Sequence, residues 1–343
     1  MKSHTIPKKL LEQFAFYDTA TDSLRLWRYE KGRAPFKKAP PKGATVIPGH
    51  FSDPRDANKE LELETRLARE VEEPVNEFLG TLGYNTFVFS PAHVRQLTTY
   101  ISLLFTRSKA RQLATRQLVD IKIESMRNLL ANEEQLSKIA AKWTMDIIED
   151  GHQLRRLVTK EEVAEMTREL IEEHLSDDQL QHDYAGAVER MMANPDETMA
   201  AGAWGIIRTE PDNPFVIGDA PVVTWERTDQ NRLIYGQGFS RSNVEVLLPV
   251  SPTACLHVLP AVRRTRQPLT PATQEVNRAQ ASFATQHCFT NIHCDKLDSD
   301  LQPCFGRVRL GINAFSFRHR DFSDTMFNLL MNRGRWTEPP LRQ

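Results

Sequence analysis

Hydrophobic residues recur at helical spacing through most of the first 200 residues. The first such segment, 58–80, carries Leu67, Val71, Val75 and Phe78 at the intervals of an amphipathic helix. Ser90-Pro91 predicts another helix start, because serine caps the first turn and proline fits its first position. The same spacing predicts further helices over 112–131, over 134–150, from Thr159 onward and over 180–193.

The pattern changes near residue 200. Short runs rich in β-branched and aromatic residues, bounded by glycine and proline, now predict strands. These runs are 203–207, 215–217, 221–225, 232–235, 244–248, 254–258, 288–293 and 308–312, with an earlier one at 23–29 and a helix from Thr270 to about His287. We therefore expect an α+β fold, in which a mainly helical N-terminal half packs against a C-terminal, mostly antiparallel β-sheet with one or more helices.

Length and composition fit an ordinary globular chain: 343 residues, 40% apolar and 26% charged. We expect a single large domain over 1–343, and its natural subdivision is into 1–198, mainly helical, and 199–343, mainly β. The uncharged stretch Val246–Val262 is too polar to span a bilayer, and the N-terminus lacks a secretory signal. The four cysteines form no C-x-x-C pair. We expect a cytoplasmic protein with no membrane partner.

The formal net charge of -1 hides an uneven distribution. The balance is +6 over residues 1–50 and -10 over 51–200, then -1 over 201–300 and +4 over 301–343. The acidic middle is typical of solvated helix faces. The basic ends leave a second interpretation open, in which they converge on an anionic partner such as nucleic acid.

Familiar catalytic motifs are missing from the sequence. It contains no phosphate-binding loop of the Gly-Lys-Ser/Thr type, no G-x-G-x-x-G after a strand, no H-E-x-x-H and no G-x-S-x-G. This argues against the common nucleotide triphosphatases, dinucleotide oxidoreductases, zincins and α/β-hydrolases.

Several charged residues fall on helix faces that should be apolar. Glu64 and Glu72 lie beside the apolar stripe of the 58–80 helix, and Arg107 and Arg111 extend the inner face of the helix that begins near Ser90. Buried charges must be paired, so we expect the arginine face to meet the glutamate face. Two interpretations stay open: an internal ion-pair network, or a polar cleft in which arginine binds phosphate and glutamate serves as base or metal ligand.

Asp219 directly follows the apolar run Phe215–Gly218 and precedes Pro221. An aspartate at such a strand end is either a turn former or a carboxylate presented for catalysis or metal binding.

A set of short motifs, in order along the chain, resembles a known family. They are His4 and Pro7 with Leu10 and Phe14, then Arg107 at a helix end, Phe215–Val222, Pro249–Pro252 and Asn277. Together these motifs are similar to those of the largely bacterial domain-of-unknown-function family 4238, and the resemblance spans His4 to about residue 290. It implies no activity, but it marks His4, Glu64, Glu72, Arg107, Asp219 and Asn277 as site candidates. Gly218 departs from the serine expected before the aspartate.

These residue types favour an intracellular hydrolase of nuclease or phosphodiesterase type. In this interpretation His4 or Glu72 acts as base, Glu64 and Asp219 hold a divalent cation, Arg107 stabilises phosphate charge and Asn277 orients a neighbour. The partner is then nucleic acid or another phosphate-bearing ligand. The alternative is a non-catalytic binding or regulatory protein with a structural charge network. A toxin or defence effector is a third interpretation, which concerns biological role. Whether the chain is an enzyme stays open.

Overall fold

The computed structural model describes most of the chain. The described residues are 2–50, 53, 55–56, 58–149, 157–174, 176–228, 230, 232–236, 238–262 and 268–308. The basic segment 309–343 lies outside them, and so does most of the strand expected at 308–312. Within the described ranges, no helix has both the length and the apolar character needed to cross a membrane.

Helices dominate the chain up to residue 200. They are α1 (Lys8–Glu12), α2 (Lys59–Leu67), the π-helical turn η1 (Ala68–Glu72), α3 (Glu73–Leu79), α4 (Pro91–Thr106), α5 (Lys109–Leu130), α6 (Glu133–Glu149), α7 (Lys160–His174), α8 (Asp177–Ala193) and α9 (Glu197–Ala200). Beyond residue 200 lie α10 (Thr273–Phe283), α11 (Asp295–Leu301) and the 3-10 turn η2 (Gln302–Cys304). The caps follow the sequence: Ser90 Oγ accepts from the His93 N–H at 3.1 Å and opens α4.

The described strands pair antiparallel in three sheets. A two-stranded sheet joins β1 (Lys2–His4) to β5 (Val46–Pro48). A five-stranded sheet has the order β6 (Ala203–Arg208), β11 (Ala254–Leu259), β10 (Val244–Ser251), β8 (Val223–Arg227) and β9 (Leu233–Tyr235). A second five-stranded sheet has the order β2 (Phe16–Asp18), β3 (Ser23–Glu30), β12 (His287–Thr290) and β7 (Ile217–Gly218), with β4 (Arg33–Ala39) paired to β3.

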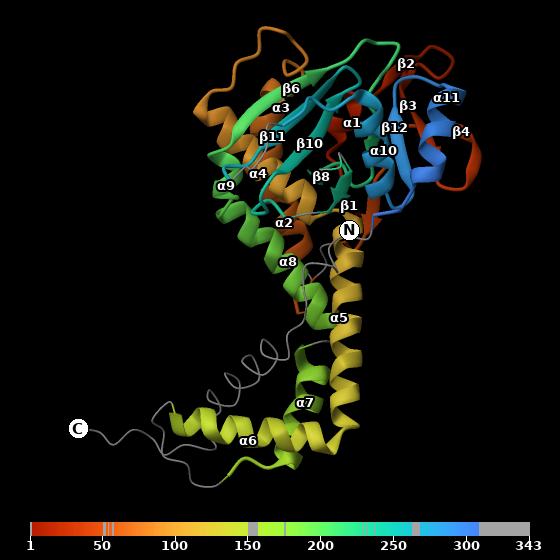
Figure 1. Ribbon diagram of the computed structural model, residues 1–343. Coiled ribbons are helices and arrows are strands. Elements are labelled where there is room, and N and C mark those ends of the chain that lie inside the picture. Colours follow the sequence, from red (N-terminus) through yellow and green to blue (C-terminus); the bar gives the residue numbers. More distant parts are fainter. Residues whose placement is uncertain are drawn as a thin grey trace. The chain divides into compact units, whose positions relative to one another are not determined.

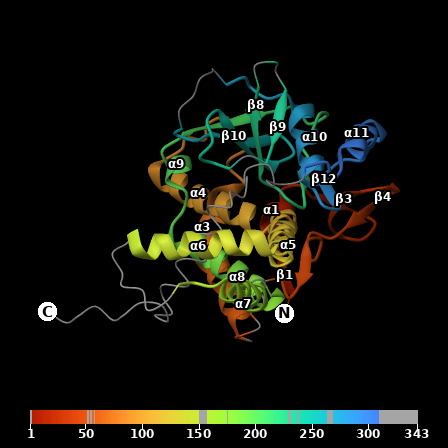
Figure 2. The same ribbon diagram turned by 60° about the horizontal axis from the view of Figure 1, so that its bottom comes forward.

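By their contacts the described residues form two compact units, one over 2–114 with 181–308 and the other over 115–180. In the first unit, the two faces of the β6–β11–β10–β8–β9 sheet are covered by different helices (Figures 1 and 2). Val246, Leu248 and Leu256 pack with the apolar stripe of α2–α4, whereas Leu247 and Cys255 on the opposite face pack with α10. The alternation along β10 and β11 therefore buries both faces.

The second sheet of this unit joins the two ends of its sequence. Cys288 in β12 lies opposite Tyr29 in β3, and it also lies opposite Gly218 in β7. The N-terminal hairpin is therefore fixed to strands from the last third of the chain, as Figure 1 shows at the right of the view.

The second unit has its own apolar core. Trp143 of α6, fully buried, packs with residues from the end of α5 and from α7, including Met126 and Val163. Thr159 and Glu162 form the expected capping box at the start of α7, with the Thr159 N–H donating to Glu162 Oε2 at 2.9 Å.

The α+β class and its order along the chain are confirmed, with helices mostly in the N-terminal half and antiparallel strands in the C-terminal half. The division at residue 199 stays a prediction.

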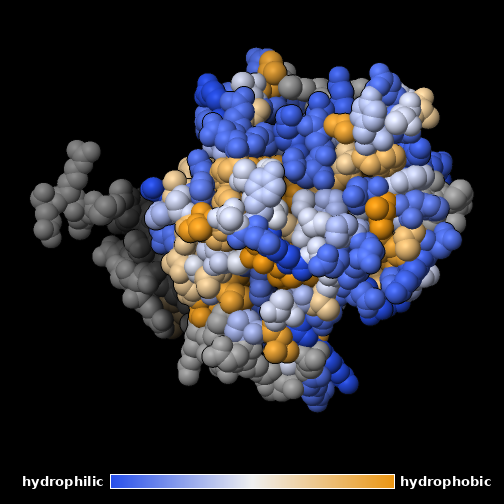
Figure 3. All heavy atoms as spheres, turned by 90° about the horizontal axis from the view of Figure 1, so that it is seen from above, coloured by the Kyte–Doolittle hydropathy of each residue, from blue (hydrophilic) through white to orange (hydrophobic). Residues whose placement is uncertain are grey.

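Over one face of the molecule, hydrophilic residues surround separate apolar patches (Figure 3).

Candidate functional site

A widened turn in the helical segment 59–79 positions Glu72. The N–H of Glu73 bonds to the Ala68 carbonyl five residues back, so η1 is a π turn between α2 and α3. Pro74 follows at once, and because proline has no N–H and its ring crowds the preceding turn, it disfavours regular α-helix here. Single π turns are frequent at functional sites. Glu64, in α2, is half-buried and lies eight residues before Glu72.

Arg107 meets Glu72 from the end of α4. The arginine side chain is only 2% exposed, and its Nη1 lies 2.8 Å from Glu72 Oε1, whose own side chain is 21% exposed. The ion pair that the helix faces predicted is thus formed by Arg107 and Glu72. Arg111 instead lies over the Phe105 ring, 5.6 Å from its centroid.

His4, at the end of β1, lies in the electrostatic field of this pair. Burial lowers the pKa of His4, and nearby Arg107 lowers it as well, whereas the negative charge of Glu72 raises it. The net pKa is below 6.5, so the imidazole is neutral at neutral pH. Tyr100, on the same face of α4 as Arg107, is fully buried, and burial raises the pKa of its phenol.

Four buried polar atoms around the ion pair have no hydrogen-bond partner among the described residues. They are His4 Nδ1, Tyr100 OH, Arg107 Nε and Asn76 Oδ1, the last on the same helix face as Glu72. Unpartnered buried polar atoms are rare and costly in folded proteins. Their concentration beside one ion pair therefore indicates a polar site that a ligand or water completes. We call His4, Glu72, Tyr100 and Arg107 the polar cluster.

A second layer of hydrogen bonds fixes the backbone beneath Arg107. His50 Nε2 lies 2.6 Å from the Arg107 carbonyl oxygen and donates to it, and the Tyr184 hydroxyl donates to the Thr106 carbonyl at 3.2 Å. Burial lowers the pKa of His50, which keeps the ring neutral. Its own carbonyl accepts from the Gln181 side chain at 2.9 Å. The end of α4 is thus held by His50, two residues after β5, and by α8.

Asp219 fills a structural role. Its carboxylate accepts hydrogen bonds from the backbone N–H groups of Thr285, Gln286 and His287 and from the Thr285 hydroxyl, at 2.6 to 3.0 Å. These groups belong to the connection from α10 to β12, where orphan N–H groups need an acceptor. Both carboxylate oxygens are therefore already occupied.

Asn277 also has both ends of its amide in use. Its Oδ1 accepts from the Val216 N–H and its Nδ2 donates to the Pro214 carbonyl, each at 2.9 Å. Gln280, one turn later on α10, bonds Gly218 and Pro221 in the same way, at 2.8 Å. The two amides bind the 214–221 segment to α10 much as a neighbouring strand would.

The structure thus brings together three of the six predicted residues, His4, Glu72 and Arg107. Glu64 lies on the helical segment that carries Glu72, while Asp219 and Asn277 hold β7 in place. Across the described ranges, no group of three or more His, Cys, Asp or Glu side chains is placed to hold a metal ion. The divalent-cation role of Glu64 and Asp219 stays a prediction.

The sequence pattern did not identify three further residues of the site. Asn76 continues the Glu64–Glu72 row by four residues, and the Tyr100 hydroxyl lies on an apolar helix face, so both carried a readable signal. His50 carried none, because it lies outside any periodic segment and its contact with Arg107 joins residues 57 positions apart.

The model of one protein family, described as "Protein of unknown function (DUF4238)", matches residues 2–293. The searches of curated proteins and of solved structures gave no match.

Proposed function

Since this chain belongs to the DUF4238 family, whose description assigns no activity, we propose its function from the polar cluster: a hydrolase that cleaves phosphodiester bonds. The observation that carries this proposal is the incomplete pairing of Arg107. A buried guanidinium gives Nη1 to Glu72 and leaves Nε without a hydrogen-bond partner among the described residues, beside a neutral histidine.

Each group has a role that suits its state. Arg107 binds a phosphoryl oxygen and stabilises the charge that develops on it, since arginine donors fit phosphate geometry. His4 accepts a proton from the attacking water, because a general base must be unprotonated at the working pH. The water oxygen bonds to phosphorus, the ester P–O bond breaks, and the leaving oxygen takes a proton from solvent. Glu72 orients Arg107 and stabilises the protonated His4.

Access to the cluster is from the His4 and Glu72 side. His4 is half-buried and Glu72 is 21% exposed, whereas Arg107 and Tyr100 are buried behind them. A phosphate that enters there meets the base before it meets the guanidinium. The neutral Tyr100 phenol then supplies one further donor.

The test is hydrolysis of bis-p-nitrophenyl phosphate and of labelled DNA and RNA by the purified chain, with EDTA, Mg²⁺ or Mn²⁺. We expect His4→Ala and Arg107→Lys each to lower the rate by about 100-fold or more, as for loss of a base or a charge-stabilising donor. The matched control is His182→Ala, which removes a histidine that is 40% exposed and paired with Asp53. A rate that His4→Ala leaves unchanged would overturn the proposal.

A second candidate is a non-catalytic module that binds a phosphate-bearing ligand. The 2.8 Å Arg107–Glu72 pair and the fully used Asp219 and Asn277 favour it, because structural networks have this form. It predicts tight ligand binding without turnover in every metal condition. For the toxin or defence interpretation, the test is growth on expression: loss of toxicity with His4→Ala supports it, and harmless overexpression of the wild type contradicts it.

A further inference from the structure

The N-terminal hairpin carries a concentrated positive charge. Residues 23–42, which hold β3 and β4, contain seven lysine and arginine residues and one acid, Glu30. Glu30 pairs with Arg28 and Arg33, and Lys38 pairs with Asp18. Lys31, Lys37 and Lys42 are exposed and form no ion pair with any other residue that the structure describes. Such surplus charge attracts a polyanion.

Aromatic side chains lie beside Lys38 of this hairpin, on the face of β3 and β4 opposite to that of Lys37. Trp27 of β3 stacks on Phe16 with ring centroids 5.7 Å apart, and Lys38 lies over both rings, 5.4 Å from the Trp27 centroid. The His293 ring lies 5.0 Å from Trp27. Basic and aromatic residues on a sheet are typical of proteins that bind single strands, where phosphates meet cations and bases meet rings.

The loop after β12 connects this surface to a pocket. His293 contacts Trp27, and the next residue, Cys294, lines a pocket of about 290 Å³ between α10 and α11. The loop is fixed from below by Tyr29, whose hydroxyl donates to the Ile292 carbonyl and accepts from the Cys294 N–H, both at 3.2 Å. The loop after β12 therefore joins the basic hairpin and its ring cluster to the pocket, and we treat the three together as one candidate surface.

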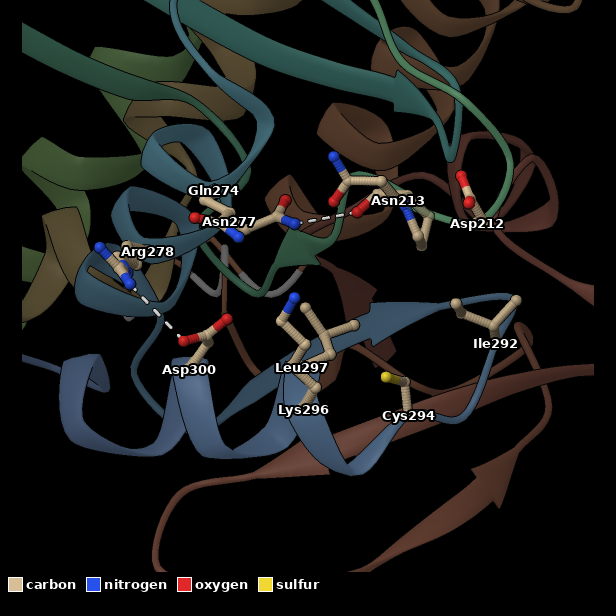
Figure 4. A pocket seen from close by; sticks show the side chains of 11 residues that line it. Asp212, Asn213, Gln274, Asn277, Arg278, Ile292, Cys294, Lys296, Leu297 and Asp300 are labelled. Atoms are coloured by element: carbon tan, nitrogen blue, oxygen red, sulfur yellow. Dashed lines mark hydrogen bonds and ion pairs between the residues drawn. The ribbon is translucent and has the colours of Figure 1, made fainter.

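The lining of the pocket suits a flat, uncharged, polar-edged group. Figure 4 shows Lys296 and Leu297, from α11, pointing toward Asn277 and the Asn213 loop. Arg278 and Asp300 pair with each other at 3.5 Å, so they contribute no net charge. Ile292 and Leu297 offer apolar contact, while Gln274 and Asp212 offer donors and acceptors at the edge. A nucleobase needs this combination.

We propose that this surface binds single-stranded nucleic acid, with its phosphates on the β3–β4 hairpin and one base in the α10–α11 pocket. A single strand is favoured because a base in a duplex is stacked and paired, and must be flipped out before it can enter a pocket. The proposal deepens the proposed function by naming its substrate class, and it rests on that function for the cleavage step alone.

Binding is tested with the full chain carrying His4→Ala, so that the probe is not cut. The probes are fluorescein-labelled 12-nucleotide oligothymidylate and oligouridylate, with a duplex of equal length, in fluorescence anisotropy at 50 and 200 mM NaCl. We expect saturable single-strand binding that weakens with salt, weaker duplex binding, and a loss of about tenfold for the double variant K31E/K37E. Lys138→Glu, the reversal of one exposed lysine on α6, should leave the affinity unchanged.

A second variant tests the pocket. Gln274→Trp places a large ring at the mouth of the pocket from an exposed position on α10, and we expect it to weaken single-strand binding by about fivefold, the scale of one stacked base. Thermal melting of each variant checks that it is folded.

Three results would overturn the proposal: no saturable binding of either oligonucleotide, equal binding of the duplex, or variants that bind like Lys138→Glu. Binding to vesicles of anionic phospholipid in place of oligonucleotides would also overturn it, since the hairpin would then serve a membrane surface. Binding without cleavage by the unmutated chain would contradict the hydrolase and leave this inference standing. Cleavage of bis-p-nitrophenyl phosphate without oligonucleotide binding would support the hydrolase and contradict this inference.

Discussion

The charged guanidinium of Arg107 is almost entirely buried, and its partner Glu72 is less buried than the arginine. Such a pair adds little net stability when intact, because desolvation offsets attraction. Losing one member is different, since the other charge is then left without compensation in a poorly solvated place. The polar cluster is therefore sensitive to the removal of either charge, whatever its chemistry.

We expect Arg107→Ala to lower the free energy of unfolding by about 3 kcal/mol, the usual result of breaking a buried pair. Adding Glu72→Gln to that variant should restore part of the loss, because no uncompensated carboxylate remains. Urea unfolding of the single and double variants measures this. A single variant within about 0.5 kcal/mol of the wild type would contradict it, since that is the scale of ordinary surface substitutions.

A second prediction about a single residue concerns the pKa of His4. Because burial lowers this pKa, the acid limb of kcat/KM should lie at lower pH than for an ordinary histidine. Glu72→Gln removes the charge that raises this pKa, so the limb should move to still lower pH. The His4 ring signal in a proton NMR titration gives the same pKa without an activity. A titration at or above pH 6.5 would contradict the prediction.

At the scale of elements, β7 is held by side chains more than by strands. It pairs with β12 over two residues only, and Asp219, Asn277 and Gln280 supply the rest. We expect Asp219→Ala to destabilise the protein by about 2–3 kcal/mol, because three backbone N–H groups lose their acceptor. Thermal or urea unfolding checks this, with the exposed Asp295→Ala as control. An Asp219→Ala variant as stable as the control would show that the clamp is dispensable.

Close packing of β7 against α10 explains why position 218 is glycine and not the expected serine. A Cβ at this position would lie 2.8 Å from the Gln280 carbonyl oxygen and 3.3 Å from the Ala284 side chain. The strand approaches α10 too closely for any side chain, so no hydroxyl role exists here. We expect Gly218→Ser to lower the melting temperature, whereas Gly238→Ser, in open space, should not. An unchanged melting temperature for Gly218→Ser would mean that α10 can move aside.

Periodicity predicted most helices and strands within a few residues, because amphipathic spacing and capping are local properties. It also predicted the Arg107–Glu72 pair, since two helix faces with opposite charges must be reconciled when buried. It could not separate Asp219 as a backbone acceptor from Asp219 as a ligand, because both uses place an aspartate after a strand. The π form of the turn at Ala68–Glu72 could not be read, because Pro74 indicates a break in regular α-helix but not the geometry of that break. The contact from His50 could not be read either, since it depends on tertiary packing.

At the scale of the whole chain, the compact unit that contains Thr115–Leu180 has a core separate from that of the sheets. We expect Trp143→Ala, which empties a fully buried site, to cost about 3–5 kcal/mol within that unit. Hydrogen exchange should then accelerate in α6 and α7 and stay unchanged in β10 and β11. Leu256→Ala, in the sheet core, is the matched control and should give the opposite pattern. Equal acceleration in both units after Trp143→Ala would show that they unfold as one.

The pairing of β3 with β12 also has a consequence for the order in which the sheet can form during synthesis. Tyr29 reaches its hydrogen-bond partner at Ile292 across 263 residues of chain. At 5–20 residues per second, the β3–β4 hairpin leaves the ribosome roughly 10 to 50 s before the strand that covers its edge exists. During that interval its own lysines and arginines oppose pairing with another nascent chain, since charge on an exposed edge opposes aggregation. The residues that we expect to bind phosphates would thus first protect the incomplete sheet from aggregation.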